Sequence, residues 1–404
     1  MRGIRWLLMV LCVLCSALFA APSLAAPITV LTLKGPINPV AANYLARGIR
    51  EAEKADSVLV LRLDTPGGLD NAMRDMVQSI RNAKVPVVVY VAPTGARAAS
   101  AGMFITVAAS VNSMAPGTAI GAAHPVGGQG EEIQGSMKDK VTNDAAAYAI
   151  GLAKENGRNA AWVEQAVRKS ISAPAQEAVR LKVVDFVAKD LEDLKQKLDG
   201  RKINLGNRTV ILSTKNESLR MVELTPTEQF LYRISDPTIA FILLNLGMMG
   251  LFFELSTPGA ILPGVIGGIC LLLATFALGM LPVNFAGLLL IALAFILFIA
   301  EIFVPGFGAL PVGGIIALIL GGLMLFNASA PELGLSIQNA ILIAVSVGAF
   351  FFFAVGMGLR AQKKKVTTGE DALIGHQAEA KTPLDPEGTV FLEGERWNAI
   401  AENG

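Results

Sequence analysis

Ser100 stands in a sequence context that suits a nucleophile. It follows the apolar run 85–91, which predicts a strand, and it lies in the small-residue segment 98–104 (AASAGMF). An earlier turn, residues 64–68 (DTPGG), ends in two glycines, which let the backbone approach a reacting group closely. A serine oxygen attacks a carbonyl when a base takes its proton and fixed donors, such as backbone N–H groups, meet the developing negative oxygen. The two segments together predict a serine nucleophile beside an oxyanion hole.

Three basic side chains follow Ser100 closely enough in sequence to be considered as its base: His124, Lys138 and Lys140. The glycine-rich stretch 127–135 lies between the histidine and the lysines and suits a mobile flap over a cleft. Lys140 leads into a good helix-forming segment, so we expect its ammonium near the positive end of a helix, where the charge is disfavoured. A lysine that is also buried gives up its proton more readily, and serine–lysine pairs are a known variant of the catalytic triad.

Each of these residues also has a purely structural interpretation. Ser100 can be a small residue that lets a helix pack tightly on a sheet, and Lys140 a solvated charge. His124 can be a loop residue bonded to the backbone, and we expect Lys138 to face solvent. No metal site is predicted, because His124 and His376 are the only histidines and neither has cysteine or acidic partners at metal-ligand spacing. No cofactor is expected either.

The composition divides the chain into an exported domain and a membrane domain. Over 404 residues the hydrophobic share is 53% and the mean hydropathy +0.53, and residues 237–359 form a strongly apolar block. Residues 1–25 have a basic start, an apolar run and a small-residue cleavage site, which predict a signal peptide, the alternative being an uncleaved anchor. Cys12, Cys15 and Cys270 lie outside the exported part, so no disulfide is expected there. The net charge of +1 gives no reason to expect nucleic acid.

The first half of the chain alternates strand-like and helix-like segments, which predicts an α/β domain with a largely parallel sheet over residues 26–200. The expected segments are strands at 28–33, 58–63 and 85–91 and helices at 41–55 and 71–83. Residues 201–234 are expected to form a hairpin, with strands 202–205 and 209–212 around Gly206, followed by a short approach to the bilayer.

Residues 235–360 are predicted to cross the membrane five times. The candidate spans lie near 238–255, 261–281, 286–304, 310–326 and 337–359. Five crossings from an exported start place the C-terminus inside, where the basic cluster formed by Arg360 and residues 363–365 follows the positive-inside rule. Glu254 and Glu301 recur 47 residues apart in matching contexts, which predicts a duplicated helical hairpin with both acids near the inner face.

Four ordered motifs carry a resemblance to a known family. They are residues 64–68, 98–102, 114–121 (MAPGTAIG) and 140–143 (KVTN), and the later segment 178–187 is similar to the closing element of ClpP and crotonase-like domains. Together they resemble the long-form NfeD proteins, membrane-bound proteases whose exported domain is a ClpP-class serine protease. The resemblance spans nearly the whole chain and implies a ClpP/crotonase-like fold built from ββα repeats.

The resemblance assigns roles to particular residues. It implies that Ser100 is the nucleophile, that Lys140 is the general base, and that the N–H groups of Gly68 and Ala101 form the oxyanion hole, with Gly67 sharing that task. His124 falls where ClpP places its catalytic histidine and is the alternative base. We favour the lysine, because the motif at 140–143 is present and no acidic partner for the histidine stands out.

The family also implies a stomatin-like (SPFH) membrane protein as partner, cut in its hydrophobic C-terminal region, and at least a dimeric assembly. An apolar groove around Met103, Phe104 and Ile120 would fit such a substrate, although these residues can equally form core. NfeD proteins usually end in a cytosolic five-stranded OB-like barrel, and residues 361–404 are too few to close one. We therefore expect an incomplete OB-like segment with first strands at 372–380 and 388–392, and a truncated gene product or fragment.

Three functions are compatible with these features. The first is a membrane-anchored serine endopeptidase on the outer face of the cytoplasmic membrane, with its C-terminus in the cytoplasm. The second is a non-catalytic scaffold that organises stomatin-like proteins with the same fold. The third, acyl-CoA chemistry on a crotonase fold, is weak because export separates the domain from that cofactor. The presence of both Ser100 and Lys140 favours the first.

Overall fold

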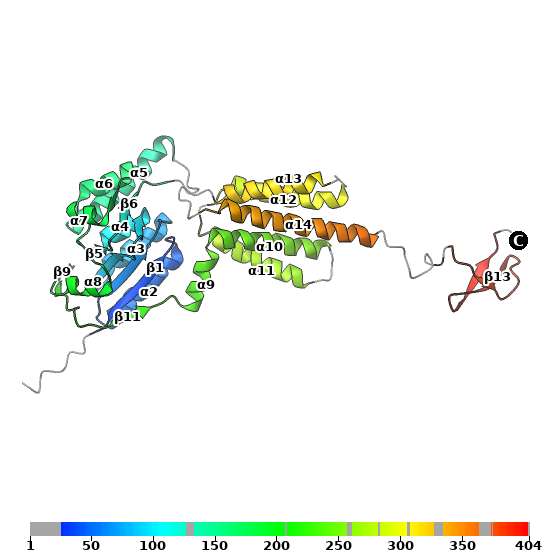
Figure 1. The fold of residues 1–404 in the computed structure, drawn as a ribbon, viewed down its shortest axis with the longest axis horizontal. Coiled ribbons are helices and arrows are strands. Elements are labelled where there is room, and N and C mark those ends of the chain that lie inside the picture. The colour runs from blue at the N-terminus through cyan, green and yellow to red at the C-terminus, as the bar shows by residue number, and fades with distance from the viewer. Residues whose placement is uncertain are drawn as a thin grey trace, which may run out of the picture.

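The structure, a computed structural model, describes residues 26–126, 133–206, 208–256, 261–281, 283–304, 308–326, 334–362, 373 and 375–402. The predicted signal peptide, most of the glycine-rich stretch and the basic cluster at 363–365 lie outside the described residues. An α/β domain is followed by a bundle of long helices and then by a small sheet (Figure 1).

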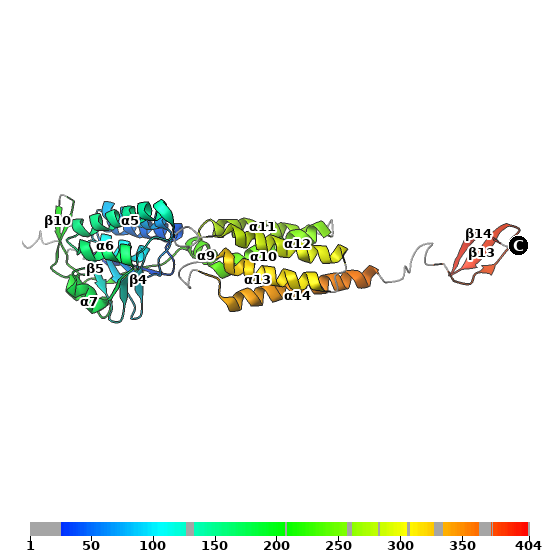
Figure 2. The same ribbon diagram turned by 90° about the horizontal axis from the view of Figure 1, so that it is seen from above.

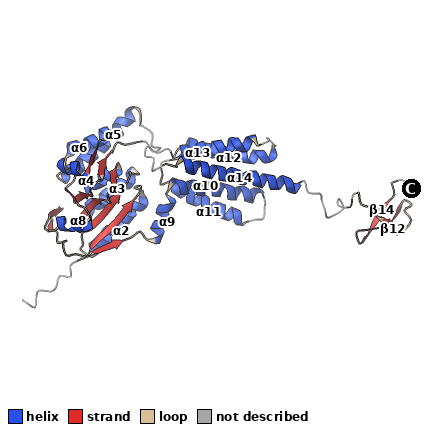
Figure 3. Ribbon diagram, viewed as in Figure 1, coloured by secondary structure: helices blue, strands red, loops and turns tan. Residues whose placement is uncertain are grey.

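A six-stranded parallel sheet forms the centre of the α/β domain, as the sequence predicts (Figure 3). Its strand order is β11-β1-β2-β3-β5-β8, and every neighbouring pair is parallel. The strands are β1 (Ile28–Lys34), β2 (Leu59–Asp64), β3 (Val87–Val91), β5 (Val111–Met114), β8 (Phe186–Val187) and β11 (Leu219–Val222). Strand β3 is buried throughout, which explains its continuous apolar sequence.

One edge of this sheet differs from the prediction. Residues 219–222 were expected in a linker, yet they form β11 and pair in parallel with β1. The pairing joins segments almost two hundred residues apart, so no local pattern announces it. The predicted hairpin is present just before it, as β9 (Lys202–Leu205) and β10 (Arg208–Ile211).

Helices cover both faces of the parallel sheet. On one face lie α2 (Pro39–Lys54), α3 (Asp70–Asn82), α4 (Ala101–Ala108) and α5 (Gly135–Glu155), and the second face carries α8 (Leu191–Leu198). Helix α2 begins at an Asn38 cap followed by proline, both favourable at a helix start. Gly48 brings α2 close to the sheet, because a Cβ there would lie 2.4 Å from Leu31 Cδ1. The domain is completed by α6 (Ala160–Lys169) and α7 (Ala175–Arg180).

A second, three-stranded sheet stands beside the first. It consists of β4 (Arg97–Ala99), β6 (Ala119–Gly121) and β7 (Ser172–Pro174), with β4 parallel and β7 antiparallel to β6. Twice along the chain a strand of the main sheet is followed by a strand of the small sheet and then by a helix, in β3-β4-α4 and in β5-β6-α5. This arrangement places the start of α4 at the edge of the small sheet.

Helix α9 (Pro226–Ile234) leaves the α/β domain and approaches the bundle (Figure 2). It begins with a complete capping box formed by Thr225 and Glu228. Arg47 on α2 binds Glu228 through two nitrogens, Nε at 3.0 Å and Nη2 at 2.7 Å. These bonds and the N–H of Thr225 hold the pKa of Glu228 below its usual range, although burial acts in the opposite direction.

Within the described part of residues 235–362, five apolar helices form the bundle: α10 (Pro237–Ser256), α11 (Leu262–Leu278), α12 (Phe285–Phe303), α13 (Ala309–Leu325) and α14 (Ile337–Gln362). Phe351 of α14 packs against two other helices, because its ring centroid lies 4.9 Å from that of Phe252 on α10 and 4.9 Å from that of Phe298 on α12. The outer surface is apolar as well, and Leu272 and Leu289 are 75% and 71% exposed. Such a surface suits lipid rather than water. Among the described residues, the stretch 237–255 is by itself long and apolar enough to cross a membrane.

The bundle contains two similar helical hairpins, α10–α11 and α12–α13. Both bounds of α13 lie 47 residues after those of α11, and glycines bring the helices together in each hairpin. Glu254 and Glu301 occupy matching places, each with one buried oxygen that has no hydrogen-bond partner among the described residues. Glu301 accepts a bond from the N–H of Gly308 at 3.1 Å.

The C-terminal segment forms a separate antiparallel sheet of β12 (Glu379–Ala380), β13 (Glu387–Leu392) and β14 (Glu395–Ile400). The predicted strand at 388–392 coincides with β13. Of the strand expected at 372–380, the described residues form strand at its end, as β12.

The ion pair between Arg47 and Glu228 predicts a pH dependence in the docking of α9. Because the pKa of Glu228 is lowered in the folded chain, the pair stabilises docking fully above the usual glutamate pKa of 4.5 and loses this effect as the pH falls below it. We expect Glu228→Gln to weaken docking at pH 7 by up to about 1 kcal/mol and to have a smaller effect at pH 3, where the carboxylate is partly protonated in the undocked state. Hydrogen exchange of the α9 amides, wild type against variant at each pH, measures both effects.

Glu164→Gln provides the control, because Glu164 pairs with Arg168 on an exposed part of α6. It should leave the α9 amides unchanged at both pH values. An equal loss of α9 protection in Glu228→Gln at pH 7 and pH 3 would contradict the ion-pair explanation.

Candidate active site

Ser100 lies on a sharp turn between a strand and a helix. It connects β4 to α4 with a φ of 52° and a ψ of −116°, a backbone conformation that residues other than glycine rarely adopt. Its N–H donates to the carbonyl of Gly121 at 2.9 Å, and its own carbonyl accepts from Met103 N–H at 2.9 Å. The hydroxyl makes no capping bond to α4. This backbone presents a half-buried side chain at a helix start, as in the strained turns that carry catalytic serines.

The hydroxyl of Ser100 faces the glycine loop predicted from the sequence. A Cβ built on Gly67 would lie 3.2 Å from Ser100 Oγ and 2.7 Å from Ser100 Cβ. Gly67 also has a φ of 119°, which disfavours any side chain. The absence of a side chain at Gly67 therefore leaves the space in front of the serine oxygen open.

The structure separates the three candidate oxyanion donors. The N–H of Gly67 donates to Thr65 Oγ1 at 3.1 Å, so it already has an acceptor. Gly67 O and Leu69 N bond to Ile37, and because successive residues of an extended segment point to opposite sides, the N–H of Gly68 points away from Ile37. The N–H of Ala101 lies in the first turn of α4, where N–H groups have no acceptor within the helix. Among the described residues, Gly68 and Ala101 therefore remain the candidate donors.

Neither of the candidate lysines is deeply buried. Helix α5 begins at Gly135, earlier than the sequence predicts, so Lys140 stands in its second turn rather than before it. The side chain of Lys140 is exposed. Lys138, expected to face solvent, lies in the first turn and is half-buried. The structure thus places Lys138 nearer the positive helix end than Lys140, and it makes the two lysines direct competitors for the role of base.

His124 is held in a defined orientation after β6. Its Nδ1 lies 2.9 Å from the carbonyl of Val167. A carbonyl only accepts, so Nδ1 is the donor in this contact, and in the tautomer that carries its proton there the acceptor nitrogen is Nε2. The histidine therefore has an orienting partner, although it is a backbone carbonyl and not a carboxylate.

The proposed substrate groove is not open. Met103, Phe104 and Ile120 are 0%, 5% and 1% exposed and belong to the main hydrophobic core. Phe104 stacks on Tyr148 of α5, with centroids 6.1 Å apart. These three side chains hold α4 and β6 in place, and the expectation that they line a groove is corrected. Their apolar character alone could not distinguish the two roles.

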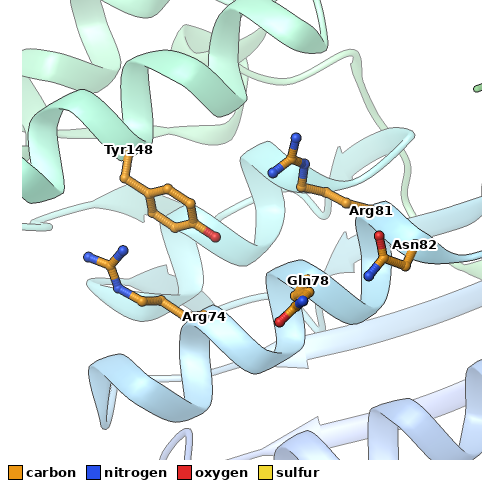
Figure 4. A pocket seen from close by; sticks show the side chains of 5 residues that line it. All are labelled: Arg74, Gln78, Arg81, Asn82 and Tyr148. Atoms are coloured by element: carbon orange, nitrogen blue, oxygen red, sulfur yellow. The ribbon is translucent and has the colours of Figure 1, made fainter.

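A pocket of about 360 Å³ lies between α3 and α5 (Figure 4). It is lined by Arg74, Gln78, Arg81, Asn82 and Tyr148. The guanidinium of Arg74 lies 4.7 Å from the centre of the Tyr148 ring. The pocket lining contains no serine, threonine or cysteine, and it shares no residue with the Ser100 turn or the glycine loop.

Two residues that sequence reasoning missed shape the site. Thr65 is fully buried, bridges to Ala98, and bonds through its hydroxyl to Gly67. A threonine two residues before a glycine is a recognisable turn signal. Ile37 holds the other side of the glycine loop, and no local signal marks it. No group of three or more histidine, cysteine or acidic residues suited to a metal occurs in the part of the chain that the structure describes.

Comparison with known proteins places the chain in a family. Residues 28–203 match the family described as NfeD1b, N-terminal domain, residues 238–357 the NfeD integral membrane domain, and residues 370–404 the NfeD-like C-terminal, partner-binding domain. The chain is 38% identical to the membrane-bound protease PH1510 of Pyrococcus horikoshii, over 94% of this chain and 89% of that protein. It is 30% identical to the membrane protein NfeD1b of Bacillus subtilis, over 89% and 84%. The chain belongs to the NfeD family, in its long form.

A solved structure is also similar to the α/β domain. It is the 1510-N membrane-bound stomatin-specific protease, as a lysine-to-alanine mutant in complex with a substrate peptide. It has 34% sequence identity and a TM-score of 0.49, and the match covers 52% of this chain and 98% of that one.

Gly68 offers a test of the loop geometry. A Cβ at this position would lie 2.1 Å from the carbonyl oxygen of Ile37, at a φ of 157°, so the loop must move to accept Gly68→Ala. We expect peptide hydrolysis to fall by about 100-fold or more, because a displaced donor no longer meets the oxyanion. Initial rates on an apolar peptide, with the melting temperature of each protein, provide the measurement.

Gly151→Ala is the matched control. Gly151 lies within α5 with no atom within 4 Å of a built Cβ, so alanine should keep activity and add about 0.5–1 kcal/mol of stability. Full activity in Gly68→Ala would show that this loop does not carry an oxyanion donor.

Proposed function

We propose that the protein is a membrane-anchored serine endopeptidase with Ser100 as its nucleophile. The observation that carries the proposal is the Ser100 turn, whose strained backbone aims the hydroxyl at the open space before Gly67. Ser100 Oγ attacks the peptide carbonyl, and the N–H groups of Gly68 and Ala101 stabilise the resulting oxyanion. The relation to the membrane-bound protease PH1510 supports the same class of activity.

Lys140 is our proposed general base. Its amine takes the proton of Ser100 Oγ as the C–O bond of the tetrahedral intermediate forms, and then gives it to the leaving amine as the C–N bond breaks. Water hydrolyses the acyl-enzyme by the same route. Lys140 is exposed among the described residues, so the proposal requires a bound substrate to cover it and remove water. His124, with its orienting bond to Val167, is the alternative base.

The proposed substrates are hydrophobic segments of membrane-associated proteins, with a stomatin-like (SPFH) protein as partner. This follows the family resemblance, and the 1510-N protease is itself named stomatin-specific. The bundle supports a position at the membrane, because its outer surface is apolar. The match of residues 370–404 to a partner-binding domain supports a second proposed binding surface for a partner protein, in the C-terminal segment.

We further propose a membrane topology and domain division. A signal peptide at 1–25 exports a ClpP-class domain at 26–200, to which β11 adds an edge strand, and five spans within 235–360 return the tail 361–404 to the cytoplasm as part of an OB-like domain. The apolar helices after the first span, such as Leu262–Leu278, have lengths at the lower limit for crossing a bilayer. The enzyme is proposed to act as a dimer or larger homo-oligomer, without cofactor or nucleic acid.

The catalytic assignment is tested on the full chain in lipid nanodiscs with an apolar peptide from a neighbouring stomatin-like protein. Ser100→Ala and Lys140→Ala should each lower kcat by about 1,000-fold or more, because residues of one catalytic unit fail together. Lys138→Ala should keep activity within about threefold. Cleavage is followed by mass spectrometry of the products, and folding by the melting temperature.

The competing bases give distinct outcomes. Loss of activity in His124→Ala or Lys138→Ala, with activity retained in Lys140→Ala, would assign the base to that residue and overturn the Ser100–Lys140 dyad. Absence of cleavage by folded, oligomeric wild-type protein across diverse apolar peptides would favour the non-catalytic scaffold.

A further inference from the structure

A tyrosine on the membrane-linking helix α9 contacts the connection between β1 and α2. Tyr232 Oη lies 3.1 Å from the carbonyl oxygen of Lys34 and 3.0 Å from that of Pro36. A Cβ at Gly35, which has a φ of 118°, would lie 2.7 Å from the same tyrosine oxygen. The turn at residues 34–36 is therefore shaped around this hydroxyl. Burial raises the pKa of Tyr232, so the hydroxyl keeps its proton and acts as a donor at neutral pH.

The same turn continues directly into the residue that holds the glycine loop. Ile37 is fully buried, donates its N–H to Gly67 O at 2.8 Å, and accepts from Leu69 N–H at 2.9 Å. These two bonds fix the direction of the Gly68 N–H between them. A movement of the Pro36 backbone therefore reaches the Gly68 N–H through a single residue, Ile37. At the neighbouring position of the glycine loop, Gly67 lies next to Ser100.

Helix α9 is itself held at both ends. Near its start Glu228 is bound by Arg47 of α2. At its end the hydroxyl of Ser235 donates to the carbonyl of Leu231 at 2.9 Å, and its oxygen lies 3.0 Å from the sulfur of Met280, in the turn after α11 of the bundle. Figure 2 shows α9 between the α/β domain and the bundle. Tyr232 thus reaches the active-site loop from a helix that is fixed to the membrane part of the molecule.

We infer that Tyr232 is a positioning residue for peptide hydrolysis, an inference that rests on the proposed function. Its hydroxyl holds the carbonyls of the 34–36 turn, Ile37 then sets the register of the glycine loop, and the N–H of Gly68 meets the oxyanion. Helix α9, which links the α/β domain to the bundle, in this way positions one donor of the proposed oxyanion hole. No residue in the motifs around Ser100 or Lys140 supplies this contact.

The test compares Tyr232→Phe with Tyr90→Phe in the full chain in nanodiscs. Both variants remove one tyrosine hydroxyl that donates to a backbone carbonyl, but Tyr90 is buried, bonds Ala188 and does not touch the loop. Tyr232→Phe should lower kcat by about 10- to 100-fold, with KM changed by less than about twofold. An oxyanion donor stabilises the transition state more than the bound substrate, so displacing it by a fraction of an ångström lowers kcat and leaves substrate binding almost unchanged. Tyr90→Phe should keep kcat within about twofold.

Two further readouts separate positioning from general destabilisation. A peptide boronic acid, which forms a tetrahedral adduct with a catalytic serine, should lose affinity for Tyr232→Phe by the same factor as kcat. Hydrogen exchange of the amides at 67–69 should rise in Tyr232→Phe and stay unchanged in Tyr90→Phe. A matched fall in melting temperature in both variants, with kcat lowered equally, would assign the effect to stability and overturn the inference.

The proposed function and the inference fail in different ways. If Ser100→Ala abolishes cleavage and Tyr232→Phe cleaves like Tyr90→Phe, the protease stands and the role of Tyr232 is overturned. If cleavage survives Ser100→Ala, the protease mechanism is overturned and the role of Tyr232 with it.

Discussion

The close approach between the Ser100 turn and the Gly67–Gly68 loop is the contact on which the rest of the site depends. It exists only because Gly67 has no side chain, since any Cβ would meet the serine. The loop is held from two sides, by the Thr65 bridge to Ala98 and by the backbone bonds to Ile37. The glycine loop follows β2 of the main sheet and the Ser100 turn follows β4 of the small sheet, and the parallel bridge between Thr65 and Ala98 brings the two segments together.

The strained conformation of Ser100 requires support from its surroundings. A non-glycine residue at such dihedral angles costs about 1–3 kcal/mol. The bond from Ser100 N–H to Gly121 and the burial of Met103 and Ile120 offset this cost, because the turn cannot relax without pulling α4 and β6 out of the core. Apolar residues first considered for a groove thus fix the backbone that carries the proposed nucleophile.

The proposed nucleophile and the candidate bases are positioned to different degrees. Ser100 is fixed by the backbone, and His124 by its bond to Val167, whereas Lys140 extends from α5 into solvent. A flexible, exposed ammonium is a poor base until it is desolvated. The proposed chemistry therefore divides into a preformed part, the serine with its candidate donors, and a part that depends on what covers α5. The linker helix α9 adds a third element, which ties the preformed part to the bundle.

The sequence by itself determined the elements whose cause is local. Alternating apolar segments predicted the parallel sheet, the glycines of residues 64–68 and the small residues around Ser100 predicted the paired turns, and the apolar block after Ser235 predicted the helical bundle. Tertiary structure alone decided the contacts between distant segments. These are β11 beside β1, Ile37 beside Gly68, Tyr232 over Gly35, and the burial of Phe104. The local sequence around an apolar side chain or a backbone N–H is the same whether that group lies in the core, in a groove or in an active site. Its role depends on which remote segment packs against it, and the local sequence does not contain that information.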